Sequence, residues 1–268
     1  MVQRIILDTD IGDDIDDAYA LGLIVTSPEL ELVGVTTVFM NTSARARQAR
    51  TLLSVAGRRD VPVAAGCGAP ISPRTEYEFD ARQGYLQGTL PNQDSTCLPE
   101  AELFPVDPRH GVDFIIDTLM ASYGEIIVIT IGAMTNLAMA LVKEPRIIAR
   151  LPKVVSMAGT FDRHLSEWNI RCDPVAAQIV FQSGVPLDLV PLDVTMQVPY
   201  QRAELLELRD APRPLAQRLW AAHAARSHSM GIADPLECVD IMHDPLAVAS
   251  LLDDTLLQWR QGRVMVEL

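Results

Sequence analysis

The chain contains 268 residues, with 22 lysines and arginines against 35 aspartates and glutamates, and its formal net charge is −13. That length suits one domain with a substantial core, and the acidic balance argues against nucleic acid as a partner. The four cysteines are far apart and form no CxxC pair, so the sequence points to neither a zinc knuckle nor a disulfide framework, and a reducing cytoplasm fits best. No apolar run approaches the length of a membrane span.

Apolar β-branched runs alternate with helical patterns along the whole chain, which is typical of a mostly parallel sheet covered by helices. We expect strands at residues 4–7, 32–38, 61–64, 126–131, 154–157 and 187–190, and helices at residues 16–26, 43–56, 112–122, 134–143 and 174–183. Two stretches break this rhythm. Residues 66–109 are rich in proline, glycine and polar groups and are predicted to form an irregular active-site lid, whereas residues 200–230 are predicted to form a small helical cap. The predicted fold is one α/β domain over residues 1–268, with an open, Rossmann-like sheet.

Aspartates crowd the loop that follows the first predicted strand: Asp8, Asp10, Asp13, Asp14, Asp16 and Asp17. So many like charges repel one another unless a cation holds them, and Ca²⁺ or Mg²⁺ takes carboxylate ligands. The alternative is a solvated acidic turn in which an aspartate caps the next helix, but capping requires only one or two carboxylates. The loop therefore predicts a site for a hard divalent metal.

Other polar side chains follow the later strands, where an open parallel sheet binds its ligands. They are Asn41, Thr135, Asn136, Glu167, Trp168, Asn169, Asp173, His243 and Asp244. Each has an ordinary alternative: Asn41, Thr135 and Asn136 as helix-capping residues, Trp168 as a packing anchor, and His243 as a structural histidine. Their joint placement along one edge of the sheet favours a binding site.

Together these segments resemble the inosine-uridine preferring nucleoside hydrolases, the calcium-dependent nucleoside N-ribohydrolases. The resemblance rests on residues 8–12, 16–18, 34–41, 132–138, 167–169, 173–177, 192–195 and 243–247, and it spans nearly the whole chain in order and approximate spacing. It implies hydrolysis of the N-glycosidic bond of ribonucleosides to ribose and free base, as used in purine and pyrimidine salvage.

The resemblance also implies a role for each matching residue. Asp10, Asp17 and Asp244 would bind Ca²⁺ through carboxylates, and Thr135 through its backbone carbonyl. Such an oxygen-rich shell suits Ca²⁺ better than the smaller Mg²⁺. The attacking water would be bound to the calcium, with Asp10 as general base.

For the substrate, the resemblance implies that Asp16, Asn41, Glu167 and Asn169 hold the ribose hydroxyls and that His243 lies beside the base. His243 is the candidate acid that protonates the leaving base, because a departing base anion needs such help. Trp168, His228 and Tyr77 are candidate walls of the base pocket.

The loop after the first strand departs from the family pattern, because Asp13, Asp14 and Ile15 stand where relatives have one residue. We align the family's aspartate pair on Asp16 and Asp17, but Asp13 or Asp14 remains an alternative metal ligand. The predicted lid lacks the expected histidine and glycine signature, which leaves the base preference open. The chain ends soon after Val266, where relatives continue through another strand and helix, so we expect an exposed sheet edge that favours a homodimer or homotetramer.

Parts of the sequence are also compatible with two other functions. Asp8-Thr9-Asp10 after a strand also resembles the nucleophile motif of haloacid dehalogenase-like phosphatases, but that metal-dependent phosphohydrolase would need a downstream lysine, and Lys143 and Lys153 are poorly placed. A ribosyl-binding protein with weak or no turnover is the second alternative. The presence of both Asp10 and His243 argues against it, because binding alone needs no base and no acid.

Overall fold

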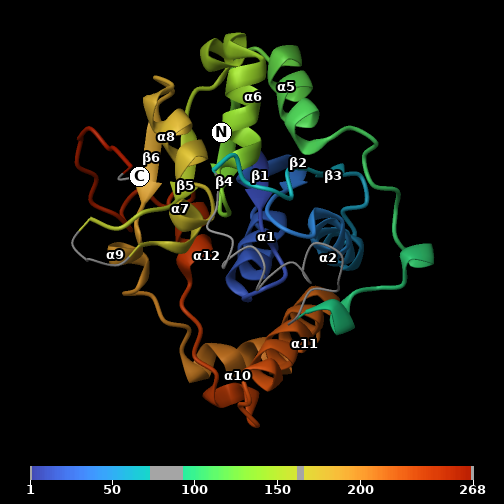
Figure 1. Cartoon of the computed structure of the whole chain (residues 1–268). Coiled ribbons are helices and arrows are strands. Elements are labelled where there is room, and N and C mark those ends of the chain that lie inside the picture. Colours follow the sequence, from blue (N-terminus) through green and yellow to red (C-terminus); the bar gives the residue numbers. More distant parts are fainter. Residues whose placement is uncertain (1, 73–92, 162–165, 267–268) are drawn as a thin grey trace.

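The sheet is parallel throughout the residues that the structure describes, which are 2–72, 93–161 and 166–266. In the computed structural model its strands pair in the order β3-β2-β1-β4-β5-β6 (Figure 1). Their bounds are β1 Gln3–Thr9, β2 Leu30–Thr37, β3 Val63–Ala65, β4 Ile126–Thr130, β5 Val154–Met157 and β6 Leu187–Val190. The direction in which the strands are added reverses between β1 and β4, as in doubly wound α/β folds.

Both faces of the sheet are covered, because successive side chains of a strand point to opposite sides. In β1, Ile5 and Leu7 belong to one core cluster and Ile6 to the other. The strands of such a sheet are expected to be apolar on both faces, which explains their continuous apolar runs.

The helices form a layer on each side of this sheet (Figure 1). Residues of the core cluster that contains Ile6 come from α5 Gly111–Ala121, α6 Thr135–Lys143 and α8 Pro174–Gln182. Residues of the cluster that contains Ile5 come from α1 Asp16–Thr26, α2 Thr42–Val55 and α12 His243–Ala249. Two short helices, α7 Trp168–Cys172 and α9 Leu192–Thr195, follow β5 and β6. The 3₁₀ turns are Asp94–Thr96, Glu100–Glu102, Pro145–Arg150 and Pro235–Glu237.

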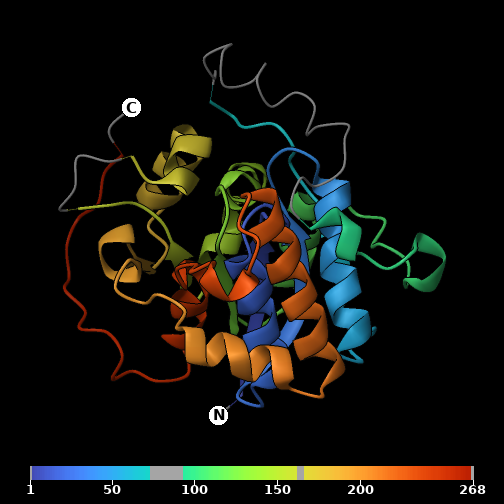
Figure 2. The same ribbon diagram turned by 90° about the horizontal axis from the view of Figure 1, so that it is seen from below.

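Two further helices, α10 Arg202–Asp210 and α11 Pro214–Ser229, lie at one end of the molecule, and Figure 2 looks onto them. The helical conformation is interrupted between them, where Pro212 lies. The helix α11 then starts at Pro214, in the first-turn position where proline is tolerated. A Cβ atom at Gly22 of α1 would lie 3.0 Å from a methyl carbon of Leu219, so this glycine lets α11 pack closely onto α1.

The predicted fold class and the predicted strands and helices are confirmed, with ends that shift by a few residues. Shifts of two residues occur at the end of β1 and at the starts of β2 and β3, and β3 pairs from Val63 rather than residue 61. Pro62 has no N–H to donate and contributes only its carbonyl, which accepts from Val35. The short α7 was not predicted, because its single turn carries no periodicity.

Residues 73–92 of the predicted lid, including Tyr77, lie outside the described residues. Its later part, residues 93–104, runs along α2, where Arg47 donates to the Leu98 carbonyl and Arg50 Nε to the Phe104 carbonyl at 2.6 Å. None of the helices within the described parts of the chain has the length and apolar character needed to cross a membrane.

Candidate active site

The candidate active site lies where the strand order reverses, at the carboxyl ends of β1 and β4. The loop after β1 supplies Asp10, and the turn after β4 supplies Gly132 and leads into Thr135. A Cβ atom at Gly132 would lie 2.7 Å from Asp10 Oδ1 and 2.9 Å from the Asp10 backbone nitrogen. Only glycine therefore allows the two loops to approach so closely, and this approach places the Asp10 carboxylate at the centre of the site.

A cluster of buried carboxylates surrounds Asp10. Asp10, Asp16, Asp17 and Asp244 are 6%, 5%, 2% and 4% exposed. The Asp244 backbone N–H donates to Asp16 Oδ2 at 3.4 Å, which joins the start of α12 to the start of α1. The Thr9 hydroxyl donates to the Asp17 carboxylate. Four acidic groups from the loop after β1, from α1 and from α12 thus meet in a space with little solvent.

Burial is the main cause of the altered acidity of these carboxylates. It raises the pKa of Asp10 to about 7, against the opposing charge of Arg45. Burial, followed by the charges of neighbouring aspartates, raises the pKa of Asp17 and that of Asp244 well above their usual range. Each shift means that ionising these groups together costs free energy unless a cation is added.

The residues present fit a divalent cation. Their donors are carboxylate oxygens, which hard cations prefer, and the carboxylates of Asp14, Asp16 and Asp17 offer atoms within 4.8 Å of one another. The charge of the buried Arg45 guanidinium acts on Asp10, but the side-chain partner of Arg45 is Asp13. The cluster therefore has the charge and the chemistry of a metal-binding site.

Asp8 has a structural role beside this cluster. Its Oδ1 accepts hydrogen bonds from Thr36 Oγ1 at 2.6 Å and from Asn136 Nδ2 at 2.8 Å. The Asn136 Oδ1 in turn accepts from the Cys67 backbone N–H at 2.7 Å. Asp8 and Asn136 therefore tie β1, β2 and α6 together beneath the site.

Asn41 and Thr135 lie at the starts of α2 and α6. Asn41 Oδ1 accepts from the Ala44 N–H at 3.0 Å, so its side chain caps α2. The two residues before it, Phe39 and Met40, have φ angles of 67° and 61°, a strained conformation for residues with side chains. The Thr135 hydroxyl donates to Asp173 Oδ2 at 2.7 Å, which leaves the backbone carbonyl as its available metal ligand.

The segment after β5 contributes Glu167, Trp168 and Asn169. Both Glu167 carboxylate oxygens accept backbone N–H groups, including that of Asn169 at 2.7 Å, so this residue caps α7. Asn169 Nδ2 donates to the carbonyls of Ile131 and Met157 at 3.1 and 3.0 Å, which fixes the orientation of its amide. The half-buried Trp168 ring meets Phe39 edge-on, with centroids 6.3 Å apart.

His243 lies next to Asp244 at the start of α12. Its Nδ1 is 2.6 Å from the Thr195 hydroxyl, which orients the ring. Burial lowers the pKa of His243, while the charges of Asp14 and Asp240 act in the opposite direction. A lowered pKa makes the protonated ring a better proton donor, which suits a general acid. The side chain of His228, by contrast, is exposed at the end of α11.

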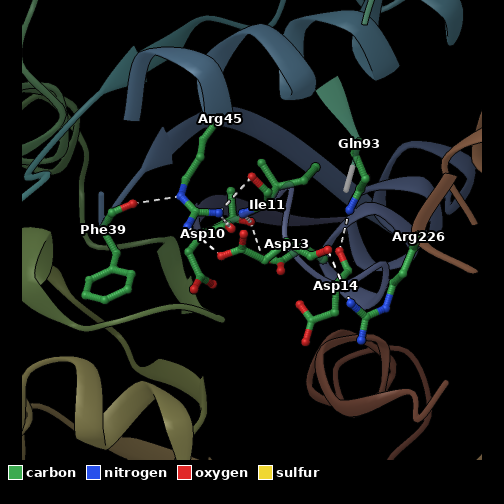
Figure 3. A network of polar contacts seen from close by, with 10 residues as sticks. Asp10, Ile11, Asp13, Asp14, Phe39, Arg45, Gln93 and Arg226 are labelled. Atoms are coloured by element: carbon green, nitrogen blue, oxygen red, sulfur yellow. Dashed lines mark hydrogen bonds and ion pairs between the residues drawn. The ribbon is translucent and has the colours of Figure 1, made fainter. Parts of the chain in front are cut away.

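The extended loop at residues 13–15 is held by Arg45, a residue whose role the sequence did not indicate (Figure 3). The Arg45 side chain is completely buried. Its Nε donates to the Phe39 carbonyl at 2.7 Å, its Nη1 to the carbonyls of Asp10 and Ile11, and its Nη2 to Asp13 Oδ2 at 2.9 Å. The available signal in the sequence was its position near the start of α2, four residues after Asn41.

Two more residues complete this attachment. Gln93 Nε2 donates to the Asp14 carbonyl, and Arg226 Nη1 donates to the Asp13 carbonyl at 3.4 Å. Figure 3 shows Arg45 on one side of the loop and Gln93 with Arg226 on the other. Asp13 thus pairs with Arg45, whereas the Asp14 side chain is exposed beside Asp16 and Asp17. Of the inserted aspartates, Asp14 is the better placed to face the site.

We expect Arg45→Met to lower the free energy of unfolding by about 3–5 kcal/mol, because it leaves buried carbonyls and the Asp13 carboxylate without their donor. Denaturant unfolding monitored by circular dichroism measures this change. Arg58→Met is the control: Arg58 is partly exposed and pairs with Asp60, so its loss is expected to cost at most about 1 kcal/mol. Equal effects of the two substitutions would contradict the role assigned to Arg45.

Comparisons with known proteins bear on the identity of this site. The family model for the inosine-uridine preferring nucleoside hydrolases matches residues 5–268. The chain belongs to this family. This nucleoside hydrolase is an enzyme that hydrolyses the N-glycosidic bond of ribonucleosides, as the sequence resemblance had implied. The phosphohydrolase alternative finds no support in this match.

Relatives of this nucleoside hydrolase match over nearly its whole length. It is 34% identical to the inosine-uridine preferring nucleoside hydrolase of Leishmania major over 278 residues, which cover 100% of this chain and 84% of that protein. It is 36% identical to an uncharacterised protein of Schizosaccharomyces pombe, with coverage of 98% and 84%. Among solved structures, the purine-preferring ribonucleoside hydrolase from Gardnerella vaginalis superposes with a TM-score of 0.81 at 30% identity, covering 99% of this chain and 84% of that one.

Proposed function

We propose that this nucleoside hydrolase uses one Ca²⁺, held by the carboxylates of Asp10, Asp17 and Asp244 and by the backbone carbonyl of Thr135. The observation that carries the proposal is the meeting of buried carboxylates from three elements at the reversal of strand order. Burial opposes their joint ionisation, so a cation with oxygen preference is required to keep them charged. When bound, the ion would supply positive charge that lowers the pKa of a water molecule.

In this proposal Asp10 is the general base that accepts a proton from the attacking water. Among the described residues no side chain donates a hydrogen bond to its carboxylate, and Arg45 contacts the Asp10 backbone carbonyl instead, so a carboxylate oxygen remains available for that proton. Positive charge develops on the ribose as the glycosidic bond breaks, and the surrounding carboxylates stabilise it. Attack from the face opposite the base predicts inversion at the anomeric carbon.

We assign the ribose hydroxyls to Asp16, Asn41, Glu167 and Asn169. Several of these side chains are already oriented by the backbone: Glu167 by the N–H groups of α7, and Asn169 by the Ile131 and Met157 carbonyls. Such orientation lowers the entropy lost when the sugar binds. Trp168 and His243 would lie on the side of the base.

The central experiment incubates the purified protein with inosine, uridine, cytidine and adenosine, in Ca²⁺ or in chelator, and measures free ribose. We expect ribose release from at least one nucleoside in Ca²⁺ and its loss in chelator. Activity that is unchanged by chelation would rule out the metal assignment. The absence of ribose from every nucleoside would instead favour the alternative of a ribosyl-binding protein.

His243→Gln is expected to lower kcat on nucleosides by about 10²-fold, the lower end of the usual contribution of a general acid. The control is a second substrate, nitrophenyl riboside, whose leaving group departs as a stable anion and needs no proton. On this substrate the kcat of His243→Gln is therefore expected to lie within tenfold of the wild-type kcat. Equal losses on both substrates would show that His243 does not act as the acid.

We also propose that the enzyme works in the cytoplasm as a homodimer or homotetramer. All four cysteines are free thiols, which suits a reducing compartment. Within the described residues β6 pairs with β5 alone and leaves one edge of the sheet open, where a second subunit could associate. Light scattering coupled to size-exclusion chromatography measures the subunit number, and a monomer at micromolar concentration would contradict the oligomer.

A further inference from the structure

A second cluster of metal-binding side chains lies between α11 and the segment that leads into α12. His223 comes from α11, and Cys238 and Asp240 come from the residues just before Ile241. Their side chains are buried, with 0%, 1% and 9% exposure. One nitrogen, one sulfur and one carboxylate oxygen of these residues all lie within 4.8 Å of one another. The proposed Ca²⁺ ligands include none of them.

The hydrogen bonds of His223 indicate which ring nitrogen carries the proton. His223 Nε2 lies 2.9 Å from the Pro235 carbonyl, which can only accept, so Nε2 is the donor. In the neutral ring Nδ1 then presents a lone pair. This Nδ1 is buried without a hydrogen-bond partner, 3.6 Å from Asp240 Oδ2. A buried nitrogen acceptor without a hydrogen-bond partner costs free energy, and a cation or a proton bound to Nδ1 would remove that cost.

The other two ligands are also aimed at the same point. Arg226 Nε donates to Asp240 Oδ1 at 3.0 Å, which leaves Oδ2 directed toward His223 and toward Cys238 Sγ, 3.7 Å away. Histidine and carboxylate ligands of metals are typically held in this way, by a hydrogen bond to the atom that does not bind the metal. The Tyr19 hydroxyl is also buried without a partner, and its ring lies 6.4 Å from that of His223.

We propose that His223 Nδ1, Cys238 Sγ and Asp240 Oδ2 bind Zn²⁺, with the Tyr19 hydroxyl or a water in the fourth position. Nitrogen and sulfur donors select zinc over calcium, which takes oxygen ligands, so this site differs in kind from the aspartate cluster. The ion replaces the proton of the Cys238 thiol, which passes to solvent, because only the thiolate is a ligand.

Binding there has a structural consequence for the active site. Asp240 lies three residues before His243, and Arg226, which holds Asp240, also donates to the Asp13 carbonyl. The ion would fasten the segment of Cys238 and Asp240 to α11 and so fix the approach to His243 and Asp244. Without it, a doubly protonated His223 paired with Asp240 would have to satisfy the same buried atoms.

Cobalt substitution tests this proposal on the full-length protein, because a thiolate bound to Co²⁺ gives a charge-transfer band in the near ultraviolet. We expect the metal-stripped protein to take up one equivalent of Co²⁺ with that band and Zn²⁺ to displace it. Cys238→Ser should abolish the band, and His223→Gln should weaken Co²⁺ binding at least tenfold. Cys97→Ser is the matched control, since Cys97 is a half-buried thiol whose Sγ contacts Gln48, and it should keep the band.

The wild-type protein alone can overturn the proposal, so the result does not depend on whether a variant folds. Stoichiometric Co²⁺ without a thiolate band would leave the protonated His223–Asp240 pair as the explanation of the cluster. A band that survives Cys238→Ser would place the metal at another thiol and would equally contradict the site. Asp10→Asn should leave the band unchanged, which separates this test from that of the Ca²⁺ proposal.

Discussion

Asp10→Asn is expected to lower kcat on nucleosides by about 10³-fold or more. A general base by itself contributes about 10²–10⁴-fold, and this substitution also removes one carboxylate from the metal shell. The amide is nearly isosteric with the acid, so the close contact with Gly132 is preserved. Steady-state kinetics in saturating Ca²⁺ measure the change in kcat, and calorimetric titration with Ca²⁺ measures the accompanying loss of affinity.

The control for Asp10 is Asp14→Asn in the same loop. The Asp14 side chain is exposed, and its backbone carbonyl, which the substitution leaves in place, accepts from Gln93. We expect kcat to fall less than tenfold and the Ca²⁺ affinity to fall modestly, because Asp14 acts on the site mainly through its charge. If Asp14→Asn instead lowered kcat and the Ca²⁺ affinity strongly while Asp10→Asn lowered them little, the ligand and base roles would belong to the inserted residues.

Removal of the metal is expected to make stability depend strongly on pH. Burial raises the pKa of Asp10 from 3.8 to about 7, and it also raises the pKa values of Asp16, Asp17 and Asp244 well above their usual range. Between the pKa of Asp10 in the unfolded chain, 3.8, and its pKa in the folded protein, about 7, the native metal-free protein keeps protons that the unfolded chain has lost. Its free energy of unfolding therefore falls as the pH rises from about 4 through about 7.

Calcium binding should oppose this loss, because the ion competes with protons for the same carboxylates. We expect the Ca²⁺-induced rise in Tm to be small near pH 5 and to increase by several degrees near pH 8. Scanning calorimetry at both pH values, with excess Ca²⁺ or with chelator, gives the comparison. Asp10→Asn is the control and should show a reduced rise at pH 8. A rise in Tm that is equal at the two pH values would argue against a metal held by these carboxylates.

The strands, the main helices and the family could be predicted because local sequence carries their signals. Runs such as Ile5-Ile6-Leu7 must be buried on both faces, and the helix bounds of α1 follow directly from the periodicity after Asp16. The placement of polar residues at the carboxyl ends of strands also located the site, because every strand of a parallel sheet presents that end at the same edge. The individual roles of all the candidate site residues, the metal ligands and His243 included, stay predictions.

The sequence by itself determined the α/β class, the family and the edge of the sheet at which the candidate site lies, because periodicity and ordered motifs are local properties of the chain. Tertiary structure decided how the inserted aspartates are used, since the Arg45 guanidinium meets the Asp13 carboxylate across 32 positions of sequence. It also brought His223 to Cys238 and Asp240, whose spacing matches no metal-binding motif. Contacts between distant segments depend on how helices pack onto the sheet, and that packing leaves no periodic trace in the sequence.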